Sequence, residues 1–374
     1  MKRKHRSFCA LVLTALLLAG CTSQAGQSGT AATEASAATT EASVAATETA
    51  ATDASEATTA AEAENSAAAA STNTIARVAK DLKGNNIVVP MEVNTIISLA
   101  PATTELLIDL GIADKIVAVD TYSAADYADL LPAGIPAFDM MNPDNEQIVA
   151  LGADLVFTTG MSYAWGEDVF ASARDAGVTI IDIESAASLQ EIMDSILFIG
   201  ECVQEKEGAE AIVAEMDAFL KDVAAVMETT DLNEKKRVLF ELSTPTPEYP
   251  TIYSVGPGSY IDEIITLVGG ENVASDTDTA WPALTEEAAV AYDPDVILST
   301  DNYTPDVEQV LLTLSGWENV SAVKNGEVYL IDANHINRPN HRVCGAILEI
   351  AKILYPDLFE ETEDPFEEVL QDAA

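Results

Sequence analysis

Five aromatic side chains stand just past the ends of predicted strands, where they could contact a ligand. Aromatic residues make up only 6% of the chain, so this shared position is informative. Flat, rigid side chains at the mouth of a cleft suit a large, partly apolar ligand, because they bury much area and lose little conformational entropy. Taken singly, each would be read as a packing residue. Together they form a set of ligand-binding candidates: Tyr122, Trp165, Tyr253, Trp281 and Tyr303.

Another candidate lies in the segment 334–342, which follows a predicted strand and holds two arginines together with His335 and His341. A guanidinium group could hold a carboxylate, a phosphate or a catecholate through two parallel hydrogen bonds. Arg342 begins the last predicted helix and could instead pair with a nearby acid. Arg338 is therefore the better ligand-binding candidate of the two.

Two segments of the chain, EQIVALGADLVFTT at 146–159 and EAAVAYDPDVILST at 287–300, read almost alike. Each reads as the end of an amphipathic helix, a turn marked by Gly or Pro, and a short apolar strand. A unit repeated once at this distance predicts two similar lobes with a cleft between them. The acids that open the copies, Glu146 and Glu287, predict a partner that contacts both lobes. The other identical pairs are Val149/Val290, Ala150/Ala291, Asp154/Asp295 and Thr159/Thr300.

Residues typical of catalysis are scarce. Beyond the N-terminal leader the chain has only two histidines, which excludes an HExxH motif and a histidine-rich zinc site. It contains no GxSxG elbow, Walker loop or GxGxxG motif. In the turn GPGS at 256–259, Ser259 with Asp262 fits a helix-capping box better than a phosphate site. We therefore expect a binding protein with no catalytic residues and no bound metal, and not an enzyme.

The elements that must position these residues follow an α/β pattern. Apolar runs bounded by turn residues alternate with helical periodicity, which is typical of βαβ units with buried parallel strands. The stretch 202–229 reads as one long helix. We predict two Rossmann-like lobes with parallel sheets, joined by this long backbone helix, with the ligand cleft between the lobes. The expected strands are 95–100, 115–120, 154–159, 178–183, 236–243, 295–300 and 327–332, and a terminal helix is expected over 341–356.

The N-terminus, 1–20, reads as a signal peptide. Basic residues precede the apolar run 8–20, which is too short to span as a stable membrane helix. Leu18-Ala19-Gly20-Cys21 resembles a bacterial lipobox, in which Cys21 would be lipidated; the alternative is an ordinary signal peptide with an incidental cysteine. The rest of the chain divides into a disordered Ala/Thr/Ser/Glu tether that starts at the lipid-anchor cysteine (21–74), an N-terminal α/β lobe (75–201), the connecting helix (202–229) and a C-terminal α/β lobe (230–374).

The charge balance restricts the partners. The chain carries 62 acidic and 18 basic residues, a formal net charge of −44. A body this acidic argues against nucleic acid or anionic lipid as a partner. Beyond the leader and Cys21 only Cys202 and Cys344 remain. They could form a disulfide in an extracytoplasmic compartment, or they could be two buried free thiols.

Several ordered motifs resemble one family. ISLAPATTELLIDLGIADKIVAVDTYS, NEQIVALGADLVF, GSYIDEIITLVGGENVASD, WPALTEEAAVAYDPDVIL and INRPNHRV follow one another with sensible spacing. Together they resemble the substrate-binding proteins for vitamin B12 and iron chelates that serve bacterial ABC importers, the class with a helical backbone. The resemblance covers residues 93–358. It implies a lipid-anchored, extracytoplasmic receptor, expected to be a monomer, that delivers a metal chelate to a permease and has no cofactor of its own.

The resemblance also assigns site residues. In that family a glutamate of each lobe docks onto arginines of the permease, and the matching positions are Glu146 and Glu287. A pocket tryptophan of the B12-binding members falls on Trp281, and an early pocket tyrosine falls near Tyr122. The sequence departs from those members at 140–141, where two methionines replace a second tryptophan. This departure counts against a corrin-specific pocket. Trp281 nevertheless makes a corrinoid such as cobalamin the first ligand expected, with a ferric siderophore or haem close behind, and the two-histidine loop keeps haem ligation open.

Two alternatives of other classes use the same scaffold. One is a surface enzyme that modifies a chelate, which would need a nucleophile or redox centre in the cleft. The other is a sensor or adhesin that keeps the fold but docks no transporter. An adjacent permease and ATPase gene, or turnover of a bound chelate, would discriminate between these readings.

Overall fold

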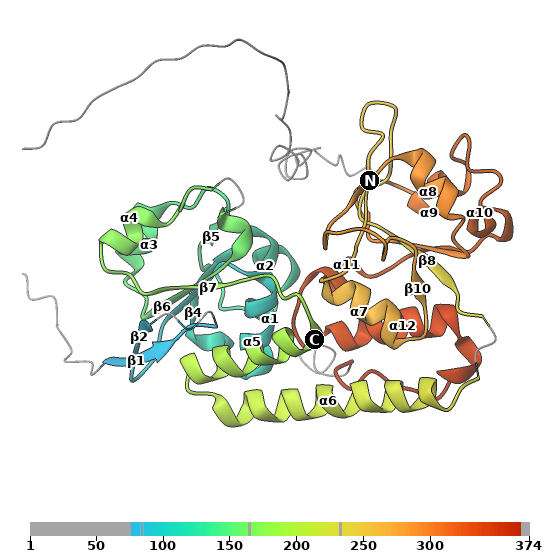
Figure 1. The fold of residues 1–374 in the computed structure, drawn as a ribbon. Coiled ribbons are helices and arrows are strands. Elements are labelled where there is room, and N and C mark those ends of the chain that lie inside the picture. Colours follow the sequence, from blue (N-terminus) through green and yellow to red (C-terminus); the bar gives the residue numbers. More distant parts are fainter. Residues whose placement is uncertain (1–75, 83, 85, 164–165, 232–233, 368–374) are drawn as a thin grey trace, which may run out of the picture. The chain divides into compact units, whose positions relative to one another are not determined.

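Two parallel β-sheets with helices packed on them form the body of the protein (Figure 1). The computed structural model describes residues 76–82, 84, 86–163, 166–231 and 234–367. These residues belong to one compact unit that starts at Thr74. Cys21, the tether and Trp165 lie outside the described residues. None of the helices in the described part of the chain is long and apolar enough to cross a membrane.

The sheet of the first lobe has the strand order β5-β4-β3-β6-β7, with all neighbours parallel. The chain starts at the central strand, builds one side of the sheet, and then crosses to the other side, which is the Rossmann arrangement. The strands are β3 (Ile96–Ser98), β4 (Ile116–Asp120), β5 (Ala137–Phe138), β6 (Leu155–Thr159) and β7 (Ile180–Ile183). The helices are α1 (Pro101–Asp109), α2 (Thr121–Asp126), α3 (Asn145–Leu151), α4 (Ala171–Asp175) and α5 (Leu189–Cys202).

The sheet of the second lobe repeats this plan with the order β10-β8-β12-β13, again parallel. Its strands are β8 (Arg237–Glu241), β10 (Glu271–Asn272), β12 (Val296–Ser299) and β13 (Val328–Leu330), and β9 (Ile252–Tyr253) pairs antiparallel with β11 (Ala283–Leu284). The helices are α7 (Tyr260–Leu267), α8 (Glu286–Tyr292), α9 (Val307–Leu312), α10 (Ser321–Asn325), α11 (Ala333–Asn337) and α12 (Val343–Leu354). The predicted α/β fold with two Rossmann-like lobes is confirmed.

The strands bury both of their faces, which explains their continuous apolar sequences. Ile96 and Leu155 pack with α1 and α5, whereas Ile97 and Val156, one residue further along, pack with α3 and α4 on the opposite face. This alternation follows from the two-residue period of a strand. The second lobe is built in the same way, with Trp317 fully buried on the face covered by α8, α9 and α10.

The long helix α6 (Lys206–Glu228) packs against α5 of the first lobe and against α7 and α12 of the second (Figure 1). The sequence predicted a helix over 202–229. The helix starts at Lys206 because α5 ends at Cys202 and Gln204 adopts a left-handed conformation with φ 63° that reverses the chain. A second difference is a hairpin of β1 (Ala76–Lys80) and β2 (Asn86–Pro90), which the strand pattern did not predict.

The repeated segment has the same local structure in both lobes. Asp144 caps α3 by accepting a hydrogen bond from the backbone N–H of Gln147 at 3.0 Å, and Thr285 caps α8 in the same way. Both helices end in a left-handed residue, Gly152 with φ 60° and Asp293 with φ 46°. This conformation closes the turn between helix and strand.

The paired aspartates of the repeat have a structural role. Asp154 Oδ2 accepts hydrogen bonds from the backbone N–H of Thr95 and from its hydroxyl, both at 3.0 Å, just before β3. Asp295 Oδ2 accepts one from the N–H of Arg237 at 2.9 Å, at the start of β8. Each aspartate therefore ties the repeated turn to the central strand of its own lobe.

Two smaller questions from the sequence are answered by the structure. Cys202 and Cys344 are both buried and are not joined in a disulfide, and burial raises the pKa of the Cys344 thiol. Ser259 Oγ accepts a hydrogen bond from the N–H of Asp262 at 3.1 Å, which confirms the helix-capping interpretation. The Asp262 carboxylate in turn accepts a hydrogen bond from Asn272.

Candidate ligand-binding site

The carboxyl ends of β8 and β12 meet at the point where the strand order of the second lobe reverses, which is where such sheets place ligands. Glu241 ends β8 and is buried, and the hydroxyl of Ser299 from β12 donates a hydrogen bond to its Oε2. Its other oxygen, Oε1, and the hydroxyl of Thr244 have no hydrogen-bond partner among the described residues. Burial raises the pKa of Glu241 to about 8, so this carboxyl group is largely protonated at neutral pH.

The protonated Glu241 predicts a pH dependence of stability. In the unfolded chain its pKa returns to 4.5, so between about pH 5 and pH 8 the unfolded state binds fewer protons than the folded state. Stability should therefore fall as the pH rises through this window. Glu241→Gln removes the contribution, and should raise the free energy of unfolding by about 4 kcal/mol at pH 8 but by less than about 1 kcal/mol at pH 5.

Urea unfolding of wild type and Glu241→Gln at pH 5 and pH 8 measures this difference. Glu210→Gln, on an exposed face of α6, is the matched control. It should change the free energy of unfolding by the same small amount at both pH values. An equal effect of Glu241→Gln at the two pH values would show that the Glu241 carboxyl is not protonated in the folded protein.

Three of the candidate aromatic residues lie in the second lobe near these strand ends. Tyr253 is half-buried in β9, opposite Ala283 of β11, and its carbonyl accepts a hydrogen bond from Leu242 just after β8. Trp281 precedes β11 and is 44% exposed. Tyr303 follows β12 and is 61% exposed. The structure thus places the β9–β11 pair and the loop after β12 beside the carboxyl edge of the sheet.

Tyr122 lies in the first lobe, in the first turn of α2 directly after β4, and is 38% exposed. Met140, at the position of the expected second tryptophan, is buried, and its carbonyl accepts a hydrogen bond from Ser162.

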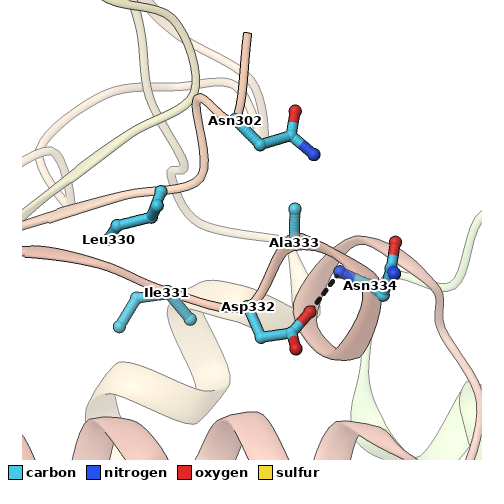
Figure 2. Close-up of a pocket in the computed structure, with 6 residues that line it drawn as sticks. All are labelled: Asn302, Leu330, Ile331, Asp332, Ala333 and Asn334. Carbon is cyan, nitrogen blue, oxygen red and sulfur yellow. Dashed lines mark hydrogen bonds between the residues drawn. The ribbon is translucent and has the colours of Figure 1, made fainter. Parts of the chain in front are cut away.

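A pocket of about 330 Å³ opens beside the loop after β12 (Figure 2). Asn302 lines one side and the segment 330–334, which begins at the last residue of β13, lines the other. Figure 2 shows the Asp332 carboxylate turned back to cap α11, where it accepts a hydrogen bond from the N–H of Asn334 at 2.8 Å. Backbone, the two amide side chains of Asn302 and Asn334, and aliphatic groups therefore form most of the wall.

Arg338 bridges the two lobes. Its guanidinium forms an ion pair with Asp126 of α2 and donates a hydrogen bond to the hydroxyl of Tyr127 at 2.6 Å. The side chain is only 11% exposed. Burial and the nearby Glu105 carboxylate raise the pKa of Tyr127, so its hydroxyl stays protonated. The charge of Arg338 is thus already paired within the chain.

Behind Arg338 lies a buried set of charged and polar side chains that we call the interlobe cluster: Glu105, Asp109, Asn340, His341 and Arg342. Asp109 Oδ2 accepts from His341 Nε2 at 2.7 Å and from Arg342 Nη2 at 2.8 Å. Asn340 donates to Glu105 at 2.7 Å. This confirms that Arg342 pairs with nearby acids. The acids themselves were missed, although Glu105 and Asp109 are spaced by about one helical turn as the two charged residues of α1.

Glu146 and Glu287 occupy the same position in the first turns of α3 and α8, and both are exposed. Within the described residues neither carboxylate forms an ion pair or accepts a hydrogen bond. Their contact with an external partner, which the repeat and the resemblance predicted, stays a prediction.

The described residues contain no group of three or more His, Cys, Asp or Glu side chains that could hold a metal ion. His341 is buried against Asp109 and the ring of Phe366, with ring centroids 4.7 Å apart. His335, on α11, remains partly exposed and lies 4.0 Å from Asp332.

Comparison with known proteins places this geometry in context. Residues 96–335 match the family model described as periplasmic binding protein. A substrate-binding lipoprotein of an ABC transporter in Bacillus subtilis is 28% identical over 96% of this chain and 100% of its own length. A cobalamin-binding protein of Halobacterium salinarum is 25% identical over 74% and 73%. The crystal structure of a vitamin B12 binding protein of Vibrio cholerae is 25% identical, with a TM-score of 0.56 over 72% of this chain and 99% of that one.

Proposed function

The chain belongs to the periplasmic binding protein family, and from this premise we propose that it captures a corrinoid outside the cytoplasm and delivers it to the permease of an ABC importer. The Bacillus subtilis relative, which this chain matches over its whole length, is named as an ABC transporter substrate-binding lipoprotein. The compared proteins of Halobacterium salinarum and Vibrio cholerae are named as binders of cobalamin and vitamin B12. We propose further that Cys21 carries the lipid anchor and that residues 21–74 form the tether.

The pairing of Arg338 is the observation that favours a corrinoid over the rival chelates. Ferric catecholates and the propionates of haem are anionic, and a binding site for them needs unpaired cations. Arg338 is paired with Asp126, and Arg342 is buried against Asp109. The acids near the strand ends, such as Asp301 and Asp332, would repel an anion. A neutral or cationic corrin meets no such penalty.

The exposed aromatic side chains support the same ligand. A corrin is large, flat and rigid, and its apolar faces would pack on four aromatic side chains that we propose as its contacts: Tyr122, Tyr253, Trp281 and Tyr303. The pocket between Asn302 and the segment 330–334 would take a peripheral group through backbone and amide hydrogen bonds.

A titration followed by visible absorption tests this proposal. Cyanocobalamin is expected to bind, and haem and a ferric tricatecholate to bind at least about tenfold more weakly. Trp281→Ala should weaken cobalamin binding by roughly tenfold. Leu82→Ala, which removes an exposed apolar side chain of the β1–β2 hairpin, is the control and should change nothing.

Tighter binding of an anionic chelate would overturn the corrinoid assignment while leaving the transport role. Chemical conversion of the bound chelate, unchanged in a Glu146→Ala/Glu287→Ala variant, would instead favour the surface enzyme.

A further inference from the structure

A second, shorter sequence repeat occurs once in each lobe. Asp-Thr-Tyr-Ser at 120–123 ends β4 in the first lobe, and Asp-Asn-Tyr-Thr at 301–304 follows β12 in the second. Each has an aspartate, a tyrosine two residues on, and a hydroxyl residue after that. The tyrosines are Tyr122 and Tyr303.

The two segments fold into the same turn. Asp120 Oδ1 accepts hydrogen bonds from the N–H groups of Tyr122 and Ser123, both at 2.9 Å, and Ser123 Oγ donates to Oδ2 at 2.5 Å. Asp301 Oδ1 accepts from the N–H groups of Tyr303 and Thr304 at 3.0 and 3.1 Å, and Thr304 Oγ1 donates to Oδ2 at 2.7 Å. In both turns a buried aspartate holds the backbone of a tyrosine.

The rings of these tyrosines are exposed although their backbones are held. Tyr122 and Tyr303 are among the most exposed large aromatic side chains of the described residues. Each follows the carboxyl end of a parallel strand, the edge where such sheets bind ligands. Asn302, inside the second turn, lines the 330 Å³ pocket (Figure 2). Holding the backbone of an exposed ring lowers the entropy lost when a ligand packs on it.

We propose that these twin turns present Tyr122 and Tyr303 as a matched pair of ligand contacts, one from each lobe, and that Asp120 and Asp301 are positioning residues that act through these rings. The proposal rests on the proposed function and names the residues that hold the flat metal macrocycle. The ring faces contact the macrocycle, and the aspartates remain buried and do not touch it.

The turns differ in one contact that makes the proposal sharply testable. Asp301 Oδ2 also accepts a hydrogen bond from the backbone N–H of Thr244 at 3.0 Å, which ties in the loop after β8. Asp120 has no such additional backbone donor among the described residues. Asparagine can therefore replace Asp120, because its amide can donate to Ser123 Oγ. At position 301 the same amide would face the N–H of Thr244, and two donors repel.

The first experiment is a double-mutant cycle on ligand affinity, measured with cyanocobalamin. Tyr122→Ala and Tyr303→Ala should each weaken binding about tenfold. Asp120→Ala should weaken binding in the wild-type background and have no further effect in the Tyr122→Ala background. An equal loss from Asp120→Ala in both backgrounds would show that the aspartate does not act through the ring.

The second experiment compares conservative variants. Asp120→Asn should bind cyanocobalamin like wild type, whereas Asp301→Asn should bind several-fold more weakly. Where Asp301→Asn fails to fold, judged by its melting temperature, Thr304→Ala is used and should also weaken binding. Equal affinities of wild type, Asp301→Asn and Thr304→Ala would overturn the proposal.

Failure of this inference is distinguishable from failure of the proposed function. If wild type binds none of cyanocobalamin, haem and a ferric tricatecholate, the proposed function fails. If wild type binds cyanocobalamin and both tyrosine variants bind it equally well, corrinoid capture stands, and the twin-turn inference fails together with the two tyrosine contacts.

Discussion

Cells that carry Glu146→Ala together with Glu287→Ala are expected to lose import of the ligand, while the purified variant binds it with unchanged affinity. We propose that these carboxylates dock onto arginines of the permease. Both are exposed, both stand in the first turn of equivalent helices, and within the described residues both lack internal partners. Opposite charges across a docking surface set its orientation and association rate, so removing both should reduce transport to background.

Uptake of labelled cobalamin, measured beside the dissociation constant of each purified variant, separates docking from capture. Each single variant should reduce uptake by about tenfold, because the remaining glutamate still orients one lobe. Glu207→Ala/Glu228→Ala removes the same charge from the exposed ends of α6 and should import normally. Normal uptake by the Glu146→Ala/Glu287→Ala variant would point to the sensor or adhesin alternative.

Asp109→Ala is expected to lower the free energy of unfolding by about 3–5 kcal/mol, the largest stability effect predicted for this protein. The Asp109 side chain is only 4% exposed, and its Oδ2 accepts hydrogen bonds from His341 and twice from Arg342. Removing the carboxylate leaves the Arg342 guanidinium buried with only the more distant Glu105 carboxylate, at 3.8 Å, to balance it.

Denaturant unfolding of the purified variant measures this loss. Asp217→Ala is the control, because it also breaks an aspartate ion pair, but an exposed one with Lys221 on α6, and should cost less than about 1 kcal/mol. A loss below about 1 kcal/mol for Asp109→Ala would show that the interlobe cluster contributes little to stability.

Since the cluster joins α1 to the segment before α12, and α6 packs on both lobes, we also expect only small closure of the two lobes on ligand binding.

The main strands could be predicted to within a few residues from the sequence. Buried parallel strands such as β6 and β12 are short apolar runs bounded by turn residues, and this signal is local. The two-residue strands β5, β9, β10 and β11 escaped prediction because they carry too few residues for any periodicity. The turn between α5 and α6 was missed because the left-handed Gln204 interrupts a sequence that is helical in composition on both sides.

The candidate site was predictable only in part. The repeat at 146 and 287 was visible because it spans fourteen residues, whereas the twin turns at 120 and 301 match over four residues and follow strands that are not equivalent in the two sheets. Their likeness becomes clear from the hydrogen bonds of Asp120 and Asp301. Tyr122 and Tyr303 were predicted as ligand contacts from their position after strands. The aspartates that hold their backbones were not predicted.

By itself, the sequence determined the α/β class, the two lobes, the terminal helix and the exposed paired glutamates, because all of these depend on local apolar pattern and on repetition. Only the tertiary structure decided the roles of the charged residues. Arg338 appeared in the sequence as a free cation, and it is paired with Asp126 of the other lobe. Asp109 was not singled out in the sequence, and it is the centre of a buried cluster. Pairing of charges far apart in the chain depends on which helices the fold brings together, and no local pattern records it.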